Sequence, residues 1–167
     1  MLRFAIIGTG KISHTFMKAA LKVPGFKLEA VYSRSQDSGR AFGSVYGADK
    51  VYTTLKALGD DPEVDAVYIA SPNSSHCAQT VFMLEHGKHV LCEKSITLNS
   101  QELAVAAGIA DKNNLVLGEA MTIYHMPLYR KLKEIVKSGQ LGTLRFVQMN
   151  FGSYKEYNME NRFFNPN

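Results

Sequence analysis

The opening stretch constrains the fold of this 167-residue chain more than any other. A short apolar run, residues 2–7, ends in Gly8-Thr9-Gly10, and apolar residues then recur at spacings of three and four from Ile12 onward. This pattern predicts a strand, a tight turn and a helix. At the turn, Gly8 permits a bend that a Cβ would obstruct, and Gly10 lets the main chain approach a ligand where the helix begins.

The predicted turn suits a pyrophosphate, because the first N–H groups of a helix lack intrahelical partners and lie at its positive end. The dinucleotide fingerprint asks for a third small residue, and here Ser13 stands in its place. The alternative is a tight turn that uses glycine for structural reasons alone. We expect the cofactor to contact the main chain and side chains of Gly8, Thr9, Gly10, Lys11 and Ile12.

Composition limits the classes of function. Hydrophobic residues make up 46% of the chain, enough for a core, yet no apolar run approaches the roughly 20 residues that span a bilayer. We therefore expect a cytoplasmic protein without a membrane partner. The formal charge of +4 is scattered, which favours solvated helix faces over a nucleic-acid site. Cys77 and Cys92 are expected to be buried and reduced, because two thiols make no disulfide framework.

Strand and helix patterns alternate along residues 1–119. After the first strand and helix, we expect strands at 26–33, 50–52, 65–70, 88–92 and 115–118, and helices at 35–46, 53–58, 76–86 and 99–112. Alternation at this spacing implies right-handed crossovers and a doubly wound parallel sheet, an α/β fold of the Rossmann type. The uninterrupted apolar run after Asp65 is typical of a strand covered on both faces.

The pattern changes after Glu119. A helix is expected at 126–138, and residues 143–151 alternate with period two, as in an antiparallel strand with one wet face. We therefore expect a dinucleotide-binding domain, 1–119, and the beginning of a second α+β domain for substrate binding and oligomerisation, 120–167. Val147, Met149 and Phe151 would leave apolar surface at an open sheet edge, so we expect a homo-oligomer.

Polar loops follow several of the predicted strands, at 8–13, 33–35, 71–76 and 93–95. In a doubly wound sheet ligands bind outside the carboxyl ends of the strands, so these loops should form one site. NAD enzymes commonly place an acidic residue after the second strand, where this chain has Ser33-Arg34-Ser35. Arg34 and Ser33 therefore favour the 2′-phosphate of NADP over NAD. Alternatively, Arg34 only stacks on adenine and accepts either cofactor.

Four motifs occur in order along the chain. They are Gly8-Thr9-Gly10-Lys11-Ile12, Ser71-Pro72-Asn73-Ser74-Ser75-His76, Gly87-Lys88-His89-Val90-Leu91-Cys92-Glu93-Lys94-Ser95, and Glu119-Ala120-Met121 with His125 and Pro127. Together they cover nearly the whole chain and resemble the glucose-fructose oxidoreductase and inositol dehydrogenase (Gfo/Idh/MocA) family. The resemblance implies an NAD(P)-dependent oxidoreductase acting on a sugar, polyol or related alcohol, with a Rossmann domain followed by an open-faced antiparallel sheet domain.

The resemblance also assigns roles to single residues. Glu93-Lys94-Ser95 corresponds to the family's Glu-Lys-Pro motif, whose lysine lies at the nicotinamide and substrate, although serine does not favour a cis peptide as proline does. An ammonium at a strand end can hold a substrate hydroxyl, whereas the plain alternative is a Glu93–Lys94 salt bridge. The family's catalytic histidine and a neighbouring acidic residue come after Asn167. We therefore expect this chain to bind the dinucleotide without turning it over.

Ser71, Pro72 and Asn73 resemble the family segment that borders the ribose and nicotinamide, although a helix N-cap cluster explains them as well. His76 either contacts the nicotinamide end or is an exposed first-turn histidine. His125 either faces the active-site cleft or is an ordinary histidine at a helix start. His14 is expected on the solvent side of the first helix.

Rival functions remain open at this point. A dinucleotide-binding regulator or sensor would keep the fold without the chemistry, and Ser95 favours it. A methyltransferase with a similar sheet would leave the Glu93-Lys94 loop unexplained. His86, His89 and Cys92 invite a zinc interpretation, but they run from a helix end into a strand and their side chains should diverge, so we expect no metal site.

Overall fold

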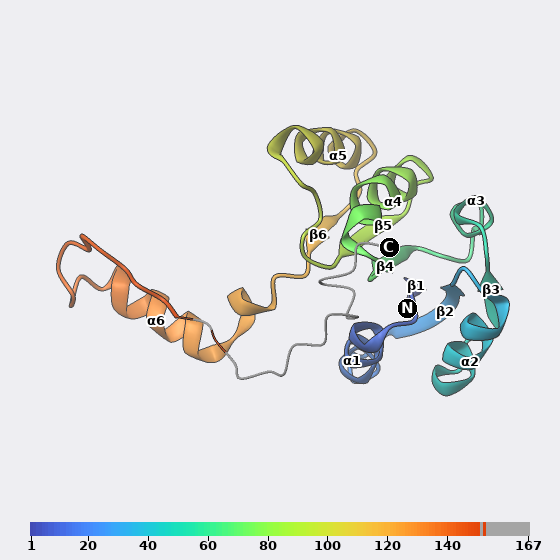
Figure 1. Ribbon diagram of the computed structural model, residues 1–167, viewed down its shortest axis with the longest axis horizontal. Coiled ribbons are helices and arrows are strands. Elements are labelled where there is room, and N and C mark those ends of the chain that lie inside the picture. The colour runs from blue at the N-terminus through green and yellow to red at the C-terminus, as the bar shows by residue number, and fades with distance from the viewer. Residues whose placement is uncertain (151, 153–167) are drawn as a thin grey trace. The chain divides into compact units, whose positions relative to one another are not determined.

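The structure, a computed structural model, describes residues 1–150 and 152. The chain divides into two compact units, Met1–Ile123 and Tyr124–Asn167. The first unit holds a six-stranded sheet in the order β3-β2-β1-β4-β5-β6, with every neighbouring pair parallel (Figure 1). The strands are β1 (Leu2–Ile7), β2 (Phe26–Tyr32), β3 (Lys50–Tyr52), β4 (Ala66–Ile69), β5 (His89–Cys92) and β6 (Leu117–Glu119). The expected Rossmann-type sheet is confirmed.

Helices cover the sheet on both faces. In the first unit they are α1 (Lys11–Ala20), α2 (Gln36–Tyr46), α3 (Leu55–Gly59), α4 (Asn73–Glu85) and α5 (Ser100–Lys112). Figure 1 shows α1 and α2 on one side of the sheet and α4 and α5 on the other. Adjacent strand residues point to opposite faces, so Ile6 packs with Met17 of α1 and Phe42 of α2, while Ile7 packs in the core that contains Met83 of α4. None of the described helices is long and apolar enough to cross a membrane.

Local sequence explains several helix ends. Asn99 accepts a hydrogen bond from the Glu102 N–H at 2.9 Å, while the Glu102 carboxylate accepts one from the Leu98 N–H at 3.0 Å. These bonds satisfy N–H groups that have no partner inside or just before α5. Gly47 ends α2 in the left-handed conformation, with φ 78°.

Several boundaries differ from the sequence-based expectation by one to three residues, and two of these differences have a clear cause. Helix α4 begins at Asn73, three residues before the expected start at His76. Pro72 has its φ fixed by its ring and needs no N–H partner, so it can directly precede the helix, and the polar residues after it form the first turn. Strand β6 begins at Leu117 and not at Leu115, because the Leu115 N–H still bonds to the Ala110 carbonyl at 2.8 Å.

The second unit contains the end of a short 3-10 helix (Thr122–His125) and α6 (Pro127–Lys137), which confirms the expected helix. Residues 143–150, expected to begin an antiparallel sheet, form no strand, and Phe151 lies outside the described residues. A strand needs hydrogen bonds to a neighbouring strand, and none of the described segments pairs with residues 143–150. The antiparallel domain therefore stays a proposal. Val147 and Met149 are exposed.

Two side chains are placed differently from the expectation. His14 does not point freely to solvent, because its Nδ1 lies 2.7 Å from the Tyr46 hydroxyl and its ring packs on Phe42 of α2. The His14 ring thus contacts α2 in place of water. Cys77 is only half-buried, whereas Cys92 is buried, and burial raises the pKa of the Cys92 thiol to about 12.

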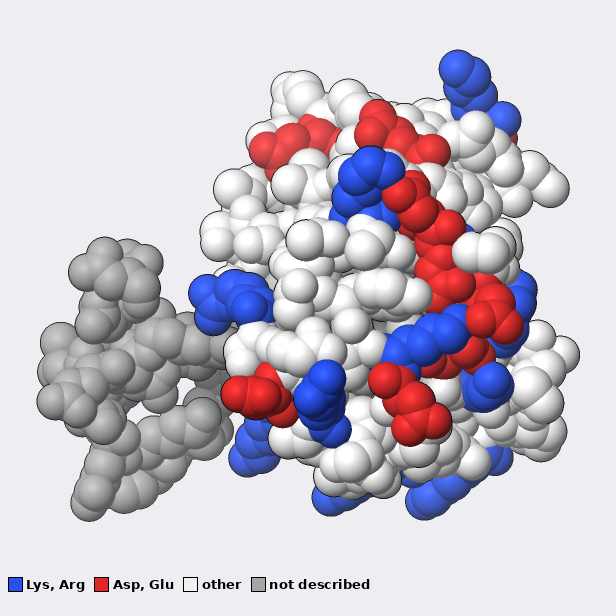
Figure 2. Space-filling model, turned by 90° about the vertical axis from the view of Figure 1, so that its right-hand side faces the viewer, with Lys and Arg blue, Asp and Glu red and all other residues white. Residues whose placement is uncertain are grey.

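Charged side chains near the amino ends of the strands are paired. Figure 2 shows a band of acidic side chains with lysine and arginine beside it. Lys50 Nζ lies 3.1 Å from Glu29, 3.2 Å from Asp61 and 2.5 Å from Glu63. Because Lys50 is shared among three carboxylates, its positive charge is compensated within this cluster.

An ion pair links β1 to the start of β4 and gives a prediction in acid. The Arg3 guanidinium bonds to the Asp65 carboxylate at 2.6 and 3.0 Å, and this bond, with smaller backbone and Coulomb contributions from Arg3, lowers the pKa of Asp65 to about 2. The folded pKa is below the unfolded one, so the stabilisation is present above about pH 4 and lost as pH falls toward 2. Asp65→Asn should remove about 1–2 kcal/mol of stability at pH 7, and little at pH 2. Urea unfolding at several pH values measures this, with exposed Asp49→Asn as control; equal losses at pH 7 and pH 2 would contradict it.

The turn after β1 gives a second prediction. Gly8 has φ 101°, and a Cβ there would lie 2.8 Å from the Ala70 carbonyl oxygen. Gly10 has φ −80° and no atom within 4 Å of the position of its Cβ. Gly8→Ala should therefore destabilise the fold by about 1–3 kcal/mol, and Gly10→Ala by less than about 1 kcal/mol. Chemical denaturation of the two variants measures the loss of folding stability. Equal losses in both variants would show that the close approach to Ala70 does not determine the effect of a side chain at residue 8.

Candidate functional site

Polar loops meet at the carboxyl edge of the sheet, as the strand order requires. Ile7, the last residue of β1, pairs with Tyr32 of β2 and with Ile69 of β4. Ile69 in turn pairs with Cys92, the last residue of β5. The loops that follow these strands therefore lie along one edge, in the order Ser33-Arg34-Ser35, Gly8-Thr9-Gly10, Ser71-Pro72 and Glu93-Lys94-Ser95.

The loop after β1 has an open helix N-terminus. Gly10 is the N-cap of α1, and no side chain caps the helix there. The first turn holds Lys11 and no acidic residue, while Thr9 is half-buried and Ile12 is exposed. The N–H groups at the positive end of α1 are thus available to an anion, because no side-chain acceptor occupies them.

Ser13 explains why this loop works without a third glycine. It is fully buried, and its hydroxyl donates to the Gly8 carbonyl oxygen at 2.7 Å. A serine is small enough for the close approach of helix and strand, and its hydrogen bond ties the first turn of α1 back to the turn.

The loop after β2 presents one cation. Arg34 is exposed beyond the end of β2. Ser33 is buried, and its hydroxyl lies 2.5 Å from that of Ser38, while the Ser35 hydroxyl accepts the Ser38 N–H at 3.5 Å as the N-cap of α2. The two serines are therefore engaged with α2, and Arg34 is the side chain left to meet a ligand at this end of the edge.

The loop after β4 is held by α4. The Ser71 hydroxyl donates to Gln79 Oε1 at 2.6 Å. Pro72 and Asn73 are exposed, and no side chain caps α4 at Pro72. The segment therefore begins α4 without the side-chain cap that the alternative interpretation requires, and Pro72 and Asn73 are exposed at the carboxyl edge. Its position beside the ribose and nicotinamide stays a prediction.

The loop after β5 carries Lys94. Its side chain is exposed and forms no salt bridge with Glu93 among the described residues, so the plain ion-pair alternative is not found. Glu93 instead accepts a hydrogen bond from the Tyr68 hydroxyl at 2.5 Å. Burial, followed by this bond to Glu93, raises the pKa of Tyr68, so the phenol stays a donor. The Lys94–Ser95 peptide bond is cis, although residue 95 is serine.

A second contact closes the same loop. The Ile96 N–H donates to Glu119 Oε1 at 3.0 Å, from the end of β6. The sequence alone did not identify Tyr68 and Glu119 as residues that hold this loop. A buried tyrosine needs a partner for its hydroxyl, and Tyr68 in the apolar run of β4 was the available signal.

His76 is buried in the first turn of α4. Its ring is 1% exposed, with Nδ1 2.9 Å from the Ser95 carbonyl oxygen and Nε2 2.8 Å from the Ser71 carbonyl oxygen. Both ring nitrogens are therefore occupied by the main chain of two neighbouring loops. The alternative of an exposed first-turn histidine is therefore wrong, and a contact of His76 with the cofactor stays a prediction.

The residues of the zinc hypothesis lie in separate environments. His86 Nδ1 bonds to the Phe82 carbonyl at 2.8 Å, and His89 Nδ1 accepts the Val116 N–H at 2.9 Å. Within the part of the chain that the structure describes, no three His, Cys, Asp or Glu side chains are grouped to hold a metal. His125 is exposed in the second unit, 3.5 Å from Arg130.

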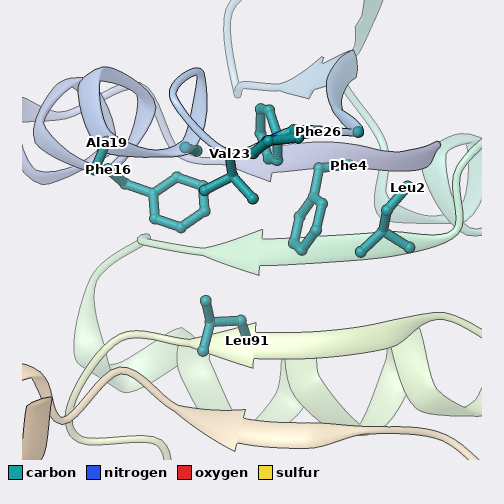
Figure 3. Close-up of a pocket in the computed structure, with 10 residues that line it drawn as sticks. Leu2, Phe4, Phe16, Ala19, Val23, Phe26 and Leu91 are labelled. Atoms are coloured by element: carbon teal, nitrogen blue, oxygen red, sulfur yellow. The ribbon is translucent and has the colours of Figure 1, made fainter.

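An apolar cavity of about 390 Å³ lies between α1 and the strands β1 and β5 (Figure 3). Phe4, Phe16, Phe26 and Leu91 contribute to its wall, and no charged side chain lines it. Leu2, at the amino end of β1, also lines it, so it extends toward the edge opposite the polar loops. This cavity lacks the groups that redox chemistry on a hydroxyl requires.

Known proteins are similar to this chain in sequence. The chain is 38% identical over 154 residues to scyllo-inositol 2-dehydrogenase (NADP(+)) IolU of Bacillus subtilis (strain 168), covering 92% of this chain and 46% of that protein. It is 35% identical over 156 residues to D-xylose 1-dehydrogenase (NADP(+)) of Hypocrea jecorina, covering 86% and 40%. The chain therefore spans less than half the length of these curated relatives.

A solved structure and a family pattern extend the comparison. KijD10, a 3-ketoreductase from Actinomadura kijaniata solved in complex with NADP and TDP-benzene, superposes with a TM-score of 0.77 at 27% identity, over 83% of this chain and 42% of that one. The pattern of the Gfo/Idh/MocA oxidoreductase family, NAD-binding Rossmann fold, matches residues 2–121, which include all the loops of the carboxyl edge. The chain therefore belongs to the Gfo/Idh/MocA family of oxidoreductases, and residues 2–121 correspond to the NAD-binding Rossmann domain of that family.

Proposed function

We propose that this protein is an NAD(P)-dependent oxidoreductase that transfers a hydride between the nicotinamide and a sugar, polyol or related alcohol. The observation that carries the proposal is that the uncapped N-terminus of α1 and the exposed Lys94 lie at the same edge of a parallel sheet. Membership of the family supports the reaction class. The names of the relatives, which specify scyllo-inositol and D-xylose, support the substrate class.

The residues fit a dinucleotide. The main chain at Gly8 already lies so close to Ala70 that a Cβ would clash, whereas the space at Gly10 is open at the helix N-terminus. The pyrophosphate would lie there, with Thr9, Lys11 and Ile12 around it. Ser71, Pro72 and Asn73 would border the ribose and nicotinamide, and the bound nicotinamide supplies the hydride acceptor or donor.

Lys94 is the proposed catalytic residue. Its ammonium has three donors on a flexible stem, and it can hold and polarise the oxygen of the substrate hydroxyl. Glu93 contributes by fixing the loop, because its carboxylate is bonded to Tyr68 inside the sheet. The charge of Lys94 lies outside that bond and stays available to the substrate.

We predict a preference for NADP(H) over NAD(H), carried by Arg34. A charge-assisted hydrogen bond to the 2′-phosphate contributes roughly 1.5–3 kcal/mol, which corresponds to about tenfold or more in the dissociation constant. Three relatives, two enzymes and one solved complex, are named with NADP, which supports the choice. Titration by nicotinamide fluorescence should give tighter binding of NADPH than NADH, and Arg34→Ala should abolish the difference.

The matched control is Arg40→Ala, which removes an exposed arginine from α2 instead of the loop after β2. It should leave both dissociation constants unchanged. Raising the salt concentration should weaken the binding of NADPH to the parent more than the binding of NADH, because only NADPH carries the additional 2′-phosphate charge. Equal constants for the two cofactors in the parent, or equal weakening of both by Arg34→Ala, would exclude the proposed role of Arg34.

We also predict that the 167-residue chain binds the dinucleotide but does not turn it over. The Gly8-Thr9-Gly10 loop and Lys94 are within it. The chain spans less than half the length of the curated relatives, and the family resemblance assigns the proton-handling histidine to the part that it does not cover. Absorbance of reduced nicotinamide, followed with a panel of sugars and polyols, should stay constant while fluorescence reports binding. Steady-state turnover at a rate typical of dehydrogenases, about 1 per second or more, would contradict this.

The rival proposal is a catalytically silent dinucleotide sensor. It shares every binding prediction above and differs only in turnover by a longer form of the protein that includes the residues after Asn167. The methyltransferase alternative predicts binding of S-adenosylmethionine, which a titration would reveal. A cytoplasmic location, a homo-oligomeric state and the absence of a nucleic-acid partner stay predictions.

A further inference from the structure

A hydrogen bond joins the middle of the sheet to the loop that carries Lys94. Tyr68 lies in β4 with 1% of its surface exposed, and its hydroxyl donates to Glu93 Oε1 at 2.5 Å. Burial, followed by this bond, raises the pKa of Tyr68, so the hydroxyl keeps its proton and donates. The other carboxylate oxygen, Oε2, lies 3.4 Å from the main-chain nitrogen of Lys94. The carboxylate therefore has the buried phenol at one oxygen and the main chain of Lys94 near the other.

The position of the phenol ring is held by its neighbours in the core. Phe16 of α1 stacks on the Tyr68 ring, with the ring centroids 3.8 Å apart and the planes inclined by 10°. In the sheet, Tyr68 pairs with Leu91 of β5. Among the described residues, Glu93 is the only group that accepts a hydrogen bond from the Tyr68 hydroxyl. A buried hydroxyl without a partner costs free energy, so this bond holds Glu93 at the ring.

The ammonium of Lys94 is the competing partner for the Glu93 carboxylate. The two residues are neighbours in sequence, and an ion pair between exposed side chains contributes little because water screens it. A hydrogen bond from a buried donor to a carboxylate is charge-assisted and therefore stronger. The structure contains the stronger of the two interactions, since the Lys94 ammonium forms no ion pair among the described residues.

A second carboxylate at this loop is engaged as well. Glu119, at the end of β6, accepts the Ile96 N–H at 3.0 Å. With Glu93 bonded to Tyr68 and Glu119 to Ile96, the positive charge of Lys94 stays uncompensated. All three donors of its ammonium are then available to an oxygen of a ligand, whereas an ion pair would occupy at least one of them.

We propose that Tyr68 is a positioning residue of the candidate site, whose hydroxyl holds the Glu93 carboxylate at the sheet and so keeps it from pairing with Lys94. Without the hydroxyl, Glu93 has no donor inside the sheet and turns to the ammonium beside it. The consequence for the substrate rests on the proposed function, because the role of Lys94 at the substrate does.

The first experiment needs no cofactor and uses the 167-residue chain. A dilute acetylating reagent is applied at fixed neutral pH, and mass spectrometry gives the acetylation rate of Lys94 relative to that of Lys112, an exposed lysine of α5. The reagent attacks only the unprotonated amine, and an ion pair stabilises the protonated one, so pairing with Glu93 lowers this ratio. Tyr68→Phe, which keeps the ring on Phe16, should lower the ratio by about twofold to fivefold, the effect of one exposed ion pair. An unchanged ratio would overturn the proposal.

A second substitution separates pairing from a loss of loop structure. Glu93→Gln removes the negative charge, so the double variant Tyr68→Phe/Glu93→Gln should return to the parent ratio. A hydroxyl that only stabilises the fold would leave the double variant at or below the ratio of Tyr68→Phe, which would refute the positioning role.

Glu93→Gln alone keeps the test decisive if Tyr68→Phe does not fold. It should change the ratio by less than about twofold, because the carboxylate of the parent is bonded to Tyr68 and not to the Lys94 ammonium. A larger rise would mean that Glu93 already pairs with Lys94 in the parent, contrary to the proposal.

The matched control is Tyr52→Phe, which removes a hydroxyl that donates to the Asp61 carboxylate at 2.9 Å. It makes the same chemical change on β3, which has β2, β1 and β4 between it and β5. The control should keep the parent ratio. An equal fall in Tyr52→Phe and Tyr68→Phe would assign the effect to general destabilisation and reject the role of Tyr68.

The second experiment adds saturating NADPH to the parent and separates this proposal from the proposed function. If Lys94 lies at the nicotinamide, NADPH should slow the acetylation of Lys94 and leave that of Lys112 unchanged. No slowing, with all variant ratios as expected, would contradict the proposed function at Lys94 and leave the positioning role of Tyr68 standing. Slowing by NADPH together with an unchanged ratio in Tyr68→Phe would support the proposed function and overturn the role of Tyr68.

Discussion

The pairing of β1 with both β2 and β4 is the constraint on which the rest of this structure depends. The strand order runs outward from β1 in both directions, so the helices that follow β1 and β4 lie on opposite faces of the sheet. A crevice opens at such a point, because neighbouring loops turn away from each other. Gly8 lies at this point, and its backbone approaches Ala70 too closely for any side chain. The N-terminus of α1 thereby lies at the edge where ligands bind in sheets of this kind.

Side chains from inside the fold hold the loops at this edge of the sheet. Tyr68 reaches from the middle of β4 to Glu93, and Gln79 reaches from α4 to Ser71. His76 contacts the main chain of both loops, and each of these side chains is buried. A buried polar side chain without a hydrogen-bond partner would cost free energy. Because these side chains find their partners in the loops, moving a loop would break the bond and carry that cost. The geometry of the site is thus set by the core.

The fold was predictable from the sequence to a greater extent than the site. The runs of β1, β4 and β5 are apolar and bounded by glycine and proline, and their alternation with helical patterns admits few topologies. The contacts of Tyr68 and His76 were not predictable, because they depend on register between strands that are far apart in sequence. The start of α4 was misplaced because Asn73-Ser74-Ser75 has the composition of a loop. Residues 143–150 show a strand pattern, but a pattern cannot supply the partner strand.

The chemistry of Lys94 limits what this domain can select. An ammonium is a compact charge whose three donors rotate freely, so it holds almost any hydroxyl oxygen and does not distinguish one polyol from another. The groups that could add direction are committed, since Glu93 is bonded to Tyr68, Glu119 to Ile96 and His76 to two carbonyls. An enzyme discriminates between substrates when a wrong substrate leaves polar groups of the site without hydrogen-bond partners. Under the proposed function, this domain would select the cofactor and place the reacting oxygen, while the choice of substrate would rest on residues outside the carboxyl edge of its sheet.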